Sequence, residues 1–137
     1  MKFAAGFSFT LLLAGAALAQ TGQGASTGVY SKAQSARGKA AYAQACANCH
    51  GAALEGADVI PALTGTRFMS TWKGQTVGDL ATRIRTTMPA DNPGSLGQAA
   101  SAELTAYLLE ANGYPAGETD LPSGNQALSQ LMIDAPK

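Results

Sequence analysis

Both cysteines and the only histidine of this chain lie within one short run, Cys46-Ala47-Asn48-Cys49-His50. Two cysteines three positions apart lie on the same side of one helical turn, and the histidine follows directly. This C-x-x-C-H spacing is the attachment sequence for c-type haem, in which each thiol forms a thioether to one vinyl group of the porphyrin. The motif therefore predicts one covalently bound haem c, with His50 as an iron ligand.

The same residues leave two other chemistries open. A disulfide or redox thiol pair suits an oxidising compartment, although a thioredoxin-like pair follows a strand and no β-rich segment precedes Cys46. A structural zinc site needs four ligands, whereas this cluster offers three and the sequence contains no second pair. The single histidine excludes two-histidine zinc sites and bis-histidine haem within one chain.

The composition favours an all-α fold of one domain. Apolar residues make up 46% of the 137 residues, and alanine dominates them, while valine and isoleucine are scarce. Alanine is the best helix former, whereas sheets favour β-branched and aromatic residues. Aromatic residues make up only 7% of the chain, so a porphyrin would fill volume that large side chains leave open.

The charges are few and nearly balanced overall. Only 13% of residues are charged, with nine basic and nine acidic, so a nucleic-acid-binding surface is not expected. The two signs are separated along the chain, because residues 20–85 carry a net charge of +4 and residues 86–137 carry −5. The acidic tail has no evident purpose in the sequence alone.

The first residues are typical of a secretory signal peptide. Lys2 precedes an uncharged and mostly apolar run, and Ala17-Leu18-Ala19 offers a small-residue cleavage pattern. We expect cleavage after Ala19 and export to the periplasm. A retained membrane anchor is the alternative, but a spanning helix needs roughly 20 strongly apolar residues, and no later segment resembles one.

Local signals predict the organisation of the remaining chain. A helix is expected over 32–46, with Ser31 and Gln34 as a capping box, and Gly38 marks close approach by another helix that carries Tyr107. Residues 48–66 are rich in glycine and are expected to form a loop. The expected parts are a signal peptide (1–19), a flexible leader (20–30), a folded domain (31–114) and a tail that wraps the domain (115–137).

Two further helices are expected in the second half of the domain. Thr76 is a typical N-cap for a helix that runs to Thr87 and stops before Met88-Pro89, because proline disfavours helix in the residue before it. Ser101 is expected to cap a final helix that ends at Gly113, a typical residue after a helix C-terminus.

An iron ligated by His50 needs a sixth ligand or keeps an open position. Met88 is the leading candidate, because it lies at a helix end before Pro89, which stiffens the turn. Met69, in the expected loop, and an open site remain as alternatives. Met132 lies in the tail and is expected to pack.

The chain resembles class I monohaem cytochromes c, and within them the small cytochromes associated with pyrroloquinoline-quinone (PQQ) alcohol dehydrogenases. The resemblance covers roughly residues 31–120. The matching motifs are Gly38-x-x-x-Tyr42, Cys46-x-x-Cys49-His50-Gly51, Leu54-Glu55-Gly56, Pro61-Ala62-Leu63, Phe68-x-x-x-Trp72, Thr76-Val77-Gly78-Asp79-Leu80, Thr87-Met88-Pro89, Pro93-Gly94-Ser95-Leu96, Ala106-Tyr107-Leu108-Leu109 and Asn112-Gly113-Tyr114-Pro115.

The resemblance implies how the residues around the haem divide their roles. Met88 would be the sixth ligand, and the carbonyl of Pro61 would accept a hydrogen bond from the other nitrogen of His50. Trp72 would border the haem and donate its indole N–H to a propionate, or serve only as a core residue. His/Met ligation favours ferrous iron and raises the reduction potential.

The resemblance also implies a function. It predicts a periplasmic electron carrier rather than an enzyme, which accepts electrons from a PQQ-dependent dehydrogenase and passes them to an oxidase or another cytochrome. One alternative is a cytochrome subunit of another periplasmic complex, such as a sulfur-compound dehydrogenase. Another is a haem sensor or enzyme with a labile sixth ligand, which the lack of a second histidine disfavours.

Overall fold

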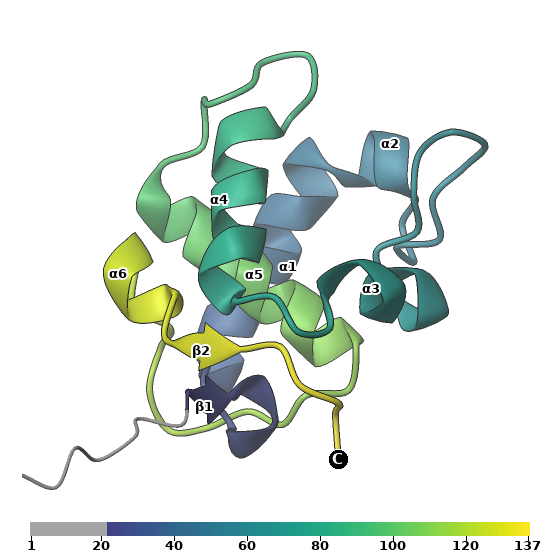
Figure 1. Cartoon of the computed structure of the whole chain (residues 1–137). Coiled ribbons are helices and arrows are strands. Elements are labelled where there is room, and N and C mark those ends of the chain that lie inside the picture. The colour runs from purple at the N-terminus through teal and green to yellow at the C-terminus, as the bar shows by residue number, and fades with distance from the viewer. Residues whose placement is uncertain (1–21) are drawn as a thin grey trace, which may run out of the picture.

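The structure, a computed structural model, describes residues 22–137 (Figure 1). The expected signal peptide, residues 1–19, lies outside the described residues. No helix among residues 22–137 is both long and apolar enough to cross a membrane. In chain order the elements are β1 (Gln23–Gly24), the 3-10 helix η1 (Ala25–Thr27), α1 (Lys32–Ala45), α2 (Ala47–His50), α3 (Gly65–Trp72), α4 (Val77–Thr87), α5 (Gln98–Ala111), α6 (Asn125–Leu128) and β2 (Leu131–Met132).

The crossing of α1 and α5 forms the framework of the domain, as predicted. A Cβ at Gly38 would overlap the backbone carbonyl of Glu103 and would lie 3.0 Å from the Cβ of Tyr107. Glycine therefore lets the two helix backbones touch, and this contact outweighs its poor helix propensity. One turn further along α1, the rings of Tyr42 and Tyr107 pack with centroids 5.4 Å apart and an interplanar angle of 54°.

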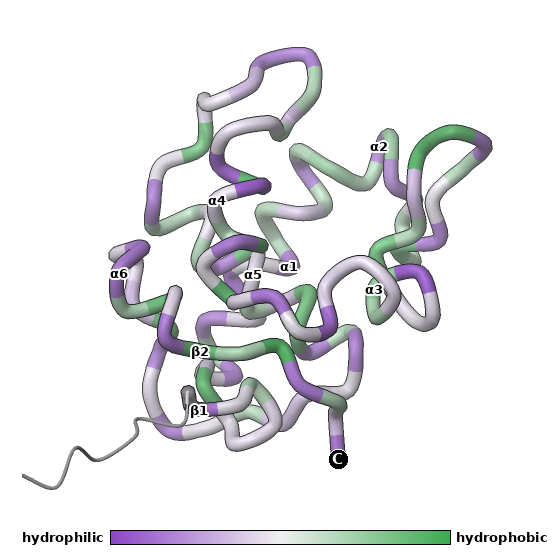
Figure 2. Tube along the Cα trace, viewed as in Figure 1, coloured by the Kyte–Doolittle hydropathy of each residue, from purple (hydrophilic) through white to green (hydrophobic). Residues whose placement is uncertain are grey.

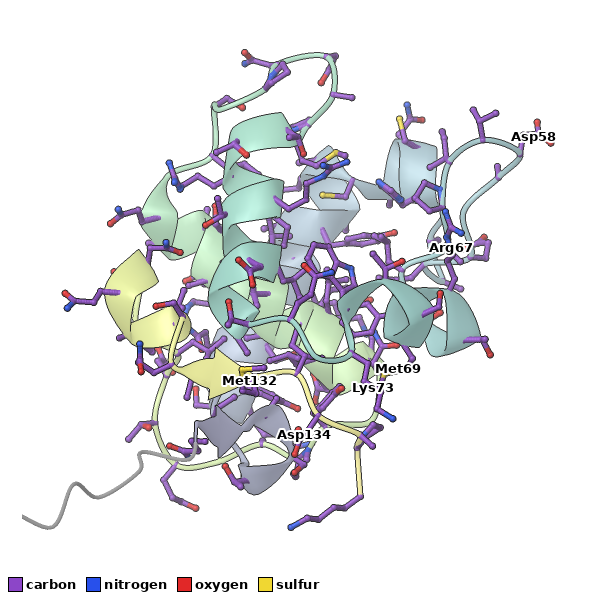
Figure 3. All side chains as sticks on the ribbon, viewed as in Figure 1. Asp58, Arg67, Met69, Lys73, Met132 and Asp134 are labelled. Atoms are coloured by element: carbon purple, nitrogen blue, oxygen red, sulfur yellow. The ribbon has the colours of Figure 1, made fainter. Side chains whose placement is uncertain are left out.

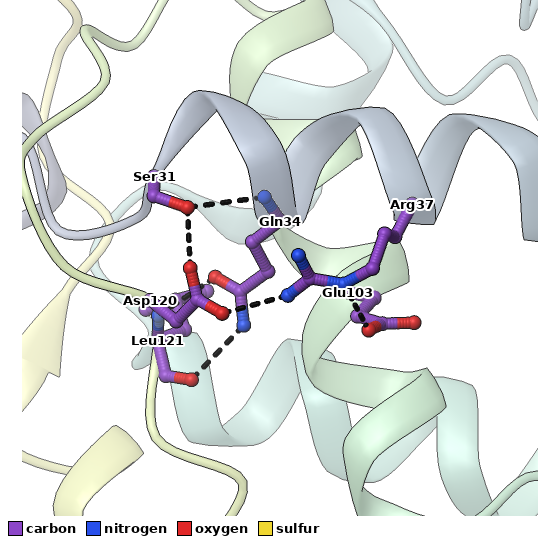
Figure 4. Close-up of polar contacts among 6 residues, drawn as sticks. All are labelled: Ser31, Gln34, Arg37, Glu103, Asp120 and Leu121. Atoms are coloured by element: carbon purple, nitrogen blue, oxygen red, sulfur yellow. Dashed lines mark hydrogen bonds and ion pairs between the residues drawn. The ribbon is translucent and has the colours of Figure 1, made fainter.

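The start of α1 agrees with the prediction in part. The Ser31 hydroxyl accepts a hydrogen bond from the backbone N–H of Gln34 at 3.0 Å, so Ser31 is the N-cap. The Gln34 side chain does not complete a capping box. Instead it forms a pair of hydrogen bonds with the backbone of Leu121 in the tail, at 2.7 and 3.0 Å (Figure 4). The predicted capping box was therefore wrong, because a tertiary partner uses the amide.

The predicted helix after Thr76 is confirmed. Thr76 and Asp79 form a complete capping box, in which each side chain accepts a hydrogen bond from the other residue's backbone N–H. The backbone N–H and the hydroxyl of Thr76 both donate to the Asp79 carboxylate and lower its pKa. The helix α4 ends at Thr87, so Met88 is its C-cap and follows directly in extended conformation.

The final helix begins earlier than predicted. The N-cap of α5 is Gly97, and Ser101 lies inside the helix, where its hydroxyl donates a hydrogen bond to the carbonyl of Gly97 at 2.9 Å. Serine commonly begins helices, which is why a cap was expected at Ser101, but here it is buried and bonds backwards along the helix. The C-terminal end agrees with the prediction, since Gly113 has a left-handed φ of 83° after the C-cap Asn112.

Residues 48–66 are not entirely a loop. The single turn α2 extends to His50, and α3 begins at Gly65, so Met69 lies on a helix rather than in a loop. Phe68 of α3 is almost fully buried in the core. A loop was expected because the segment is rich in glycine. One of these glycines, Gly65, is the first residue of α3 and has a positive φ of 65°.

The leader is not disordered over its described part. β1 pairs in parallel with β2, with Gln23 opposite Leu131 and Gly24 opposite Met132. Ala25, which follows directly, is fully buried. The disorder prediction was wrong for these residues because the partner strand lies more than one hundred positions away in sequence.

The tail covers one side of the helical framework (Figure 1). Three of its apolar side chains, Leu121, Leu128 and Ile133, are almost fully buried and belong to the same core as the helices. The helix α6 packs on α4 at Gly78, where a Cβ would lie 2.9 Å from the backbone nitrogen of Ser129. Figure 2 shows the apolar residues of β2 as a continuous green stretch.

Candidate functional site

The C-x-x-C-H residues form a single tight turn where α1 ends. The backbone N–H groups of Cys49 and His50 both donate to the carbonyl of Cys46, at 3.1 and 2.9 Å. The N–H of Gly51 closes the turn on the carbonyl of Ala47 at 2.9 Å. The two thiols and the imidazole therefore come from one compact segment.

Both thiols are free in the structure, and they differ in exposure. Cys46 is half-buried and Cys49 is exposed. Burial raises the pKa of the Cys46 thiol, and the neighbouring Cys49 adds to the shift. Both cysteines line the same large cavity, so both are available for a covalent bond to a group bound there.

The ring of His50 is oriented by the loop that follows it. Its Nδ1 lies 3.0 Å from the carbonyl oxygen of Pro61, which can only accept, so Nδ1 donates and Nε2 remains for a metal. The loop is closed at its base, because the N–H of Gly56 donates to the His50 carbonyl at 2.8 Å. A bond such as that between Nδ1 and Pro61 orients a ligating imidazole and raises its basicity.

A cavity of about 1080 Å³ lies beside this turn. This volume slightly exceeds the usual range for small-molecule and cofactor sites, roughly 300–1,000 Å³. Helices α3, α4 and α5 supply one part of the wall, and the C-x-x-C-H segment and the loops over residues 59–63 and 88–91 supply much of the rest. The apolar residues that these three helices contribute are Phe68, Trp72, Leu80, Ile84, Leu104 and Leu108.

The cavity brings together the six residues that the motif and the resemblance predicted to bind the haem. The turn of α2 and the segments on either side of it contribute Cys46, Cys49, His50 and Pro61. The last residue of α3 contributes Trp72, and the end of α4 contributes Met88. Met88 reaches this position because the capping box begins α4 and the helix ends just before Met88.

Met69 and Met132 lie elsewhere (Figure 3). The Met69 sulfur is 3.6 Å from the Tyr114 hydroxyl, which donates to the carbonyl of Asp134 at 2.5 Å. Met132 belongs to β2 and pairs with Thr76 on the tail side. Among the methionines of residues 22–137, Met88 alone lines the cavity.

Some wall residues were not predicted from sequence as part of the site. Phe68 and Thr71 precede Trp72 on α3, and Gln75 follows it in the turn toward α4. The Phe68-x-x-x-Trp72 spacing, which puts both rings on one helix face, was the available signal. The glycine-rich start of this segment, which favours a loop, obscured it.

The residues of this site fit a covalently bound haem. The cavity offers two free thiols at haem-attachment spacing, an imidazole with one nitrogen free, a thioether from Met88 and a largely apolar wall. Two arginines, Arg67 and Arg83, also line it and can pair with carboxylates of a bound group. Fold and site together define a cytochrome c-type domain.

Comparison with known proteins gives the family. A family model described as "Cytochrome C oxidase, cbb3-type, subunit III" matches residues 33–108, which is more than half of the chain. The chain belongs to this family. A comparison with curated protein sequences gave no match.

The chain is similar to the solved structure of the sulfane dehydrogenase SoxCD from Paracoccus pantotrophus. The sequences are 27% identical, the TM-score is 0.52, and the match covers 72% of this chain and 52% of that chain. The chain thus spans about half the length of the solved chain that it matches. These findings confirm the helical cytochrome c fold, the covalent haem c and a role in electron transfer, as a carrier or as a subunit of a dehydrogenase complex.

Proposed function

We propose that this protein is a periplasmic electron carrier in which His50 and Met88 ligate the iron of a haem c attached through Cys46 and Cys49. The observation that carries the proposal is that these four side chains line one cavity. The hydrogen bond from His50 Nδ1 to Pro61 supports it further, because this bond leaves Nε2 as the ligating nitrogen.

Each protein group has a defined part in this proposal. The haem supplies one-electron exchange at its iron when bound. His50 and Met88 would both ligate the iron, which would leave no open coordination position for a substrate. The thioether of Met88 favours ferrous iron and raises the potential. The apolar wall keeps water away from the cofactor, which also affects its potential.

Trp72 and Pro61 are proposed to position the cofactor rather than to react. Pro61 fixes the His50 ring by accepting its Nδ1 proton in a hydrogen bond. Trp72 lies half-buried in the cavity wall, where its indole N–H is available to a propionate. The same wall carries Arg67 and Arg83 as counter-charges for such a group.

The export of the protein and the bounds of its cytochrome domain are also part of the proposal. We propose that residues 1–19 are a signal peptide cleaved after Ala19 and that the cytochrome domain spans residues 31–114. The haem-attachment motif is consistent with an oxidising compartment, in which a free thiol pair would otherwise oxidise.

Two donor classes are proposed, each on its own observation. The motif resemblance favours a quinoprotein (PQQ) dehydrogenase. The similarity to SoxCD, a sulfane dehydrogenase, favours a dehydrogenase of sulfur compounds. In either case an oxidase or another cytochrome would accept the electron.

The test is reduction of the full-length protein, made in a bacterial periplasm, by each purified donor. Haem should remain on the chain in a denaturing gel, and the paired change Cys46→Ala with Cys49→Ala should abolish it. Stopped-flow mixing with a reduced quinoprotein alcohol dehydrogenase or a reduced sulfane dehydrogenase should give rapid ferrous absorption with the true donor. A protein that carries haem but that neither donor reduces would refute both assignments of the partner.

A further inference from the structure

The last residues of the tail cross beneath the turn that joins α3 to α4. Ile133 is fully buried and forms two backbone hydrogen bonds with that turn. Its N–H donates to the carbonyl of Gln75, and its carbonyl accepts from the N–H of Gly74, both at 2.9 Å. Figure 3 labels Met132 and Asp134, which flank Ile133, and Lys73, which precedes Gly74 in the turn.

The segment is anchored on its other side to the leader. The backbone N–H of Ser26 donates to the Asp134 carboxylate at 2.9 Å, and the Tyr114 hydroxyl donates to the Asp134 carbonyl at 2.5 Å. β1 pairs with Leu131 and Met132. Gly24 has no room for a Cβ, which would overlap the carboxylate of Asp134.

The turn that this segment holds is part of the cavity wall. Trp72 is the last residue of α3, and Gln75 accepts the hydrogen bond from Ile133 through its carbonyl. Both Trp72 and Gln75 line the cavity. The Gln75 amide also donates to the carbonyl of Thr71, another wall residue, which ties the turn to α3.

We propose that residues 131–134 act as a strap that positions the turn between α3 and α4, and through it Trp72 and Gln75, against the bound haem. Ile133 and Asp134 are the positioning residues: Ile133 holds the turn, and Asp134 holds the strap to the leader. Neither residue lines the cavity itself. The strap lies outside the region that the family model matches, residues 33–108.

The strap should affect the properties of the cofactor as well as stability. Release of the turn would let water reach the cavity beside Trp72, and water stabilises the ferric iron, which carries the higher charge. The reduction potential should therefore fall when the strap is removed. This inference rests on the proposed position of the haem in the cavity.

The test uses the fact that Trp72 is the only tryptophan of the chain. A nearby haem quenches tryptophan emission, so the fluorescence of the holoprotein reports the distance of Trp72 from the cofactor. We compare the full-length protein with a variant truncated after Gln130. The matched control lacks only residues 136–137 and keeps the strap.

If the strap holds the turn, the variant truncated after Gln130 should show brighter Trp72 emission, a lower reduction potential and faster hydrogen exchange at the Gly74 amide. The control that lacks only residues 136–137 should show no change. Unchanged emission and potential in a truncated protein that retains its haem would overturn the proposal. Asp134→Ala provides a second variant if the truncated chain does not fold. Asp134→Ala should also brighten the Trp72 emission and lower the reduction potential. Asp134→Asn, whose amide oxygen can still accept a hydrogen bond from Ser26, should keep the emission and the potential of the unmodified protein. If Asp134→Ala changes neither the emission nor the potential, the proposal is also overturned.

If the proposed function is wrong, the experiments give a result that differs from failure of the strap proposal. A full-length protein without covalent haem in the denaturing gel contradicts the proposed function before the strap is tested. Hydrogen exchange at Gly74 then still decides whether the tail holds the turn, because that measurement does not depend on the cofactor.

Discussion

In the proposed site, the sulfur of Met88 completes the coordination of the iron. We predict that Met88→Ala leaves the haem attached through Cys46 and Cys49 but lowers the reduction potential. The expected shift is on the order of 100 mV, part of the roughly 0.8 V range that axial ligands span. A potentiometric titration followed by absorption measures it.

Met69 provides the matched control for this prediction. Its sulfur lies 3.6 Å from the Tyr114 hydroxyl and not in the cavity wall, so Met69→Leu should leave the potential unchanged. If Met69→Leu lowers the potential and Met88→Ala does not, the ligand assignment is reversed.

Tyr30 gives a pH-dependent prediction. Burial, followed by the charge of Glu110, raises the pKa of Tyr30 to about 12. Because the unfolded phenol has a pKa near 10, its contribution to stability is fully present below about pH 10 and is lost as the pH rises toward 12. The free energy of unfolding, measured in urea, should therefore fall over this range.

The variant Tyr30→Phe isolates this effect. The phenol donates a buried hydrogen bond to the carbonyl of Tyr114 at 2.7 Å, so its loss should destabilise the protein by about 1–3 kcal/mol at neutral pH. Above about pH 10, the free energy of unfolding should fall less steeply in this variant than in the unmodified protein. An unchanged alkaline slope would assign the pH dependence to the other tyrosines.

At the scale of elements, the crossing of α1 and α5 depends on Gly38. The change Gly38→Ala should gain roughly 1 kcal/mol of helix propensity. The steric cost should exceed this gain, because the new methyl group would overlap the Glu103 backbone carbonyl. A backbone carbonyl cannot move away as a flexible side chain can. We expect a net loss of about 2 kcal/mol in the free energy of unfolding, within the usual range for overpacking.

Gly124→Ala is the control for this crossing. Gly124 has a φ of −82°, and no heavy atom lies within 4 Å of the place that an added methyl group would take, so the change should stay within about 0.5 kcal/mol. Equal losses in the two variants would mean that backbone flexibility, and not the close helix contact, explains the role of Gly38.

Helices with strong local signals were predictable from the sequence. The capping box of Thr76 and Asp79 and the proline after Met88 define both ends of α4. The helix α3 was not predicted, because its capping signal is weak and it begins at Gly65. The side chain of Thr64, its N-cap, makes no capping hydrogen bond.

Contacts between distant segments were not predictable from local pattern. Gln34 bonds Leu121, and Ser26 bonds Asp134, so each polar group has a partner more than eighty positions away. A sequence pattern reports neighbours along the chain, and these pairings exist only after the helices have packed. The cavity residues were predictable because the C-x-x-C-H motif and Met88-Pro89 carry their chemistry locally.

At the scale of the whole molecule, the uneven charge distribution becomes intelligible. Arg37 pairs with Glu103 and Asp120, with both N···O distances at 2.6 Å (Figure 4), and Lys32 pairs with Glu110 at 3.4 Å. Each pair joins the basic first half to the acidic second half. Exposed pairs add little stability individually because water screens them, but here they all favour the same docking of the tail and α5 on α1.

The tail and the leader together extend a helical domain whose family match spans only residues 33–108. The added segments bury Ala25 and Ile133 and hold the turn that contributes Trp72 to the cavity. The leader and the tail therefore contribute to the core and contact the turn that carries part of the cavity wall.

The most direct test of the central claim is the visible absorption of the full-length protein, made in a bacterial periplasm, first ferric and then reduced with dithionite. Ligation by His50 and Met88 predicts sharp reduced c-type bands together with a weak far-red band from sulfur to ferric iron. Reduced bands without the sulfur band would contradict Met88 as the ligand. A colourless protein would contradict the haem site itself.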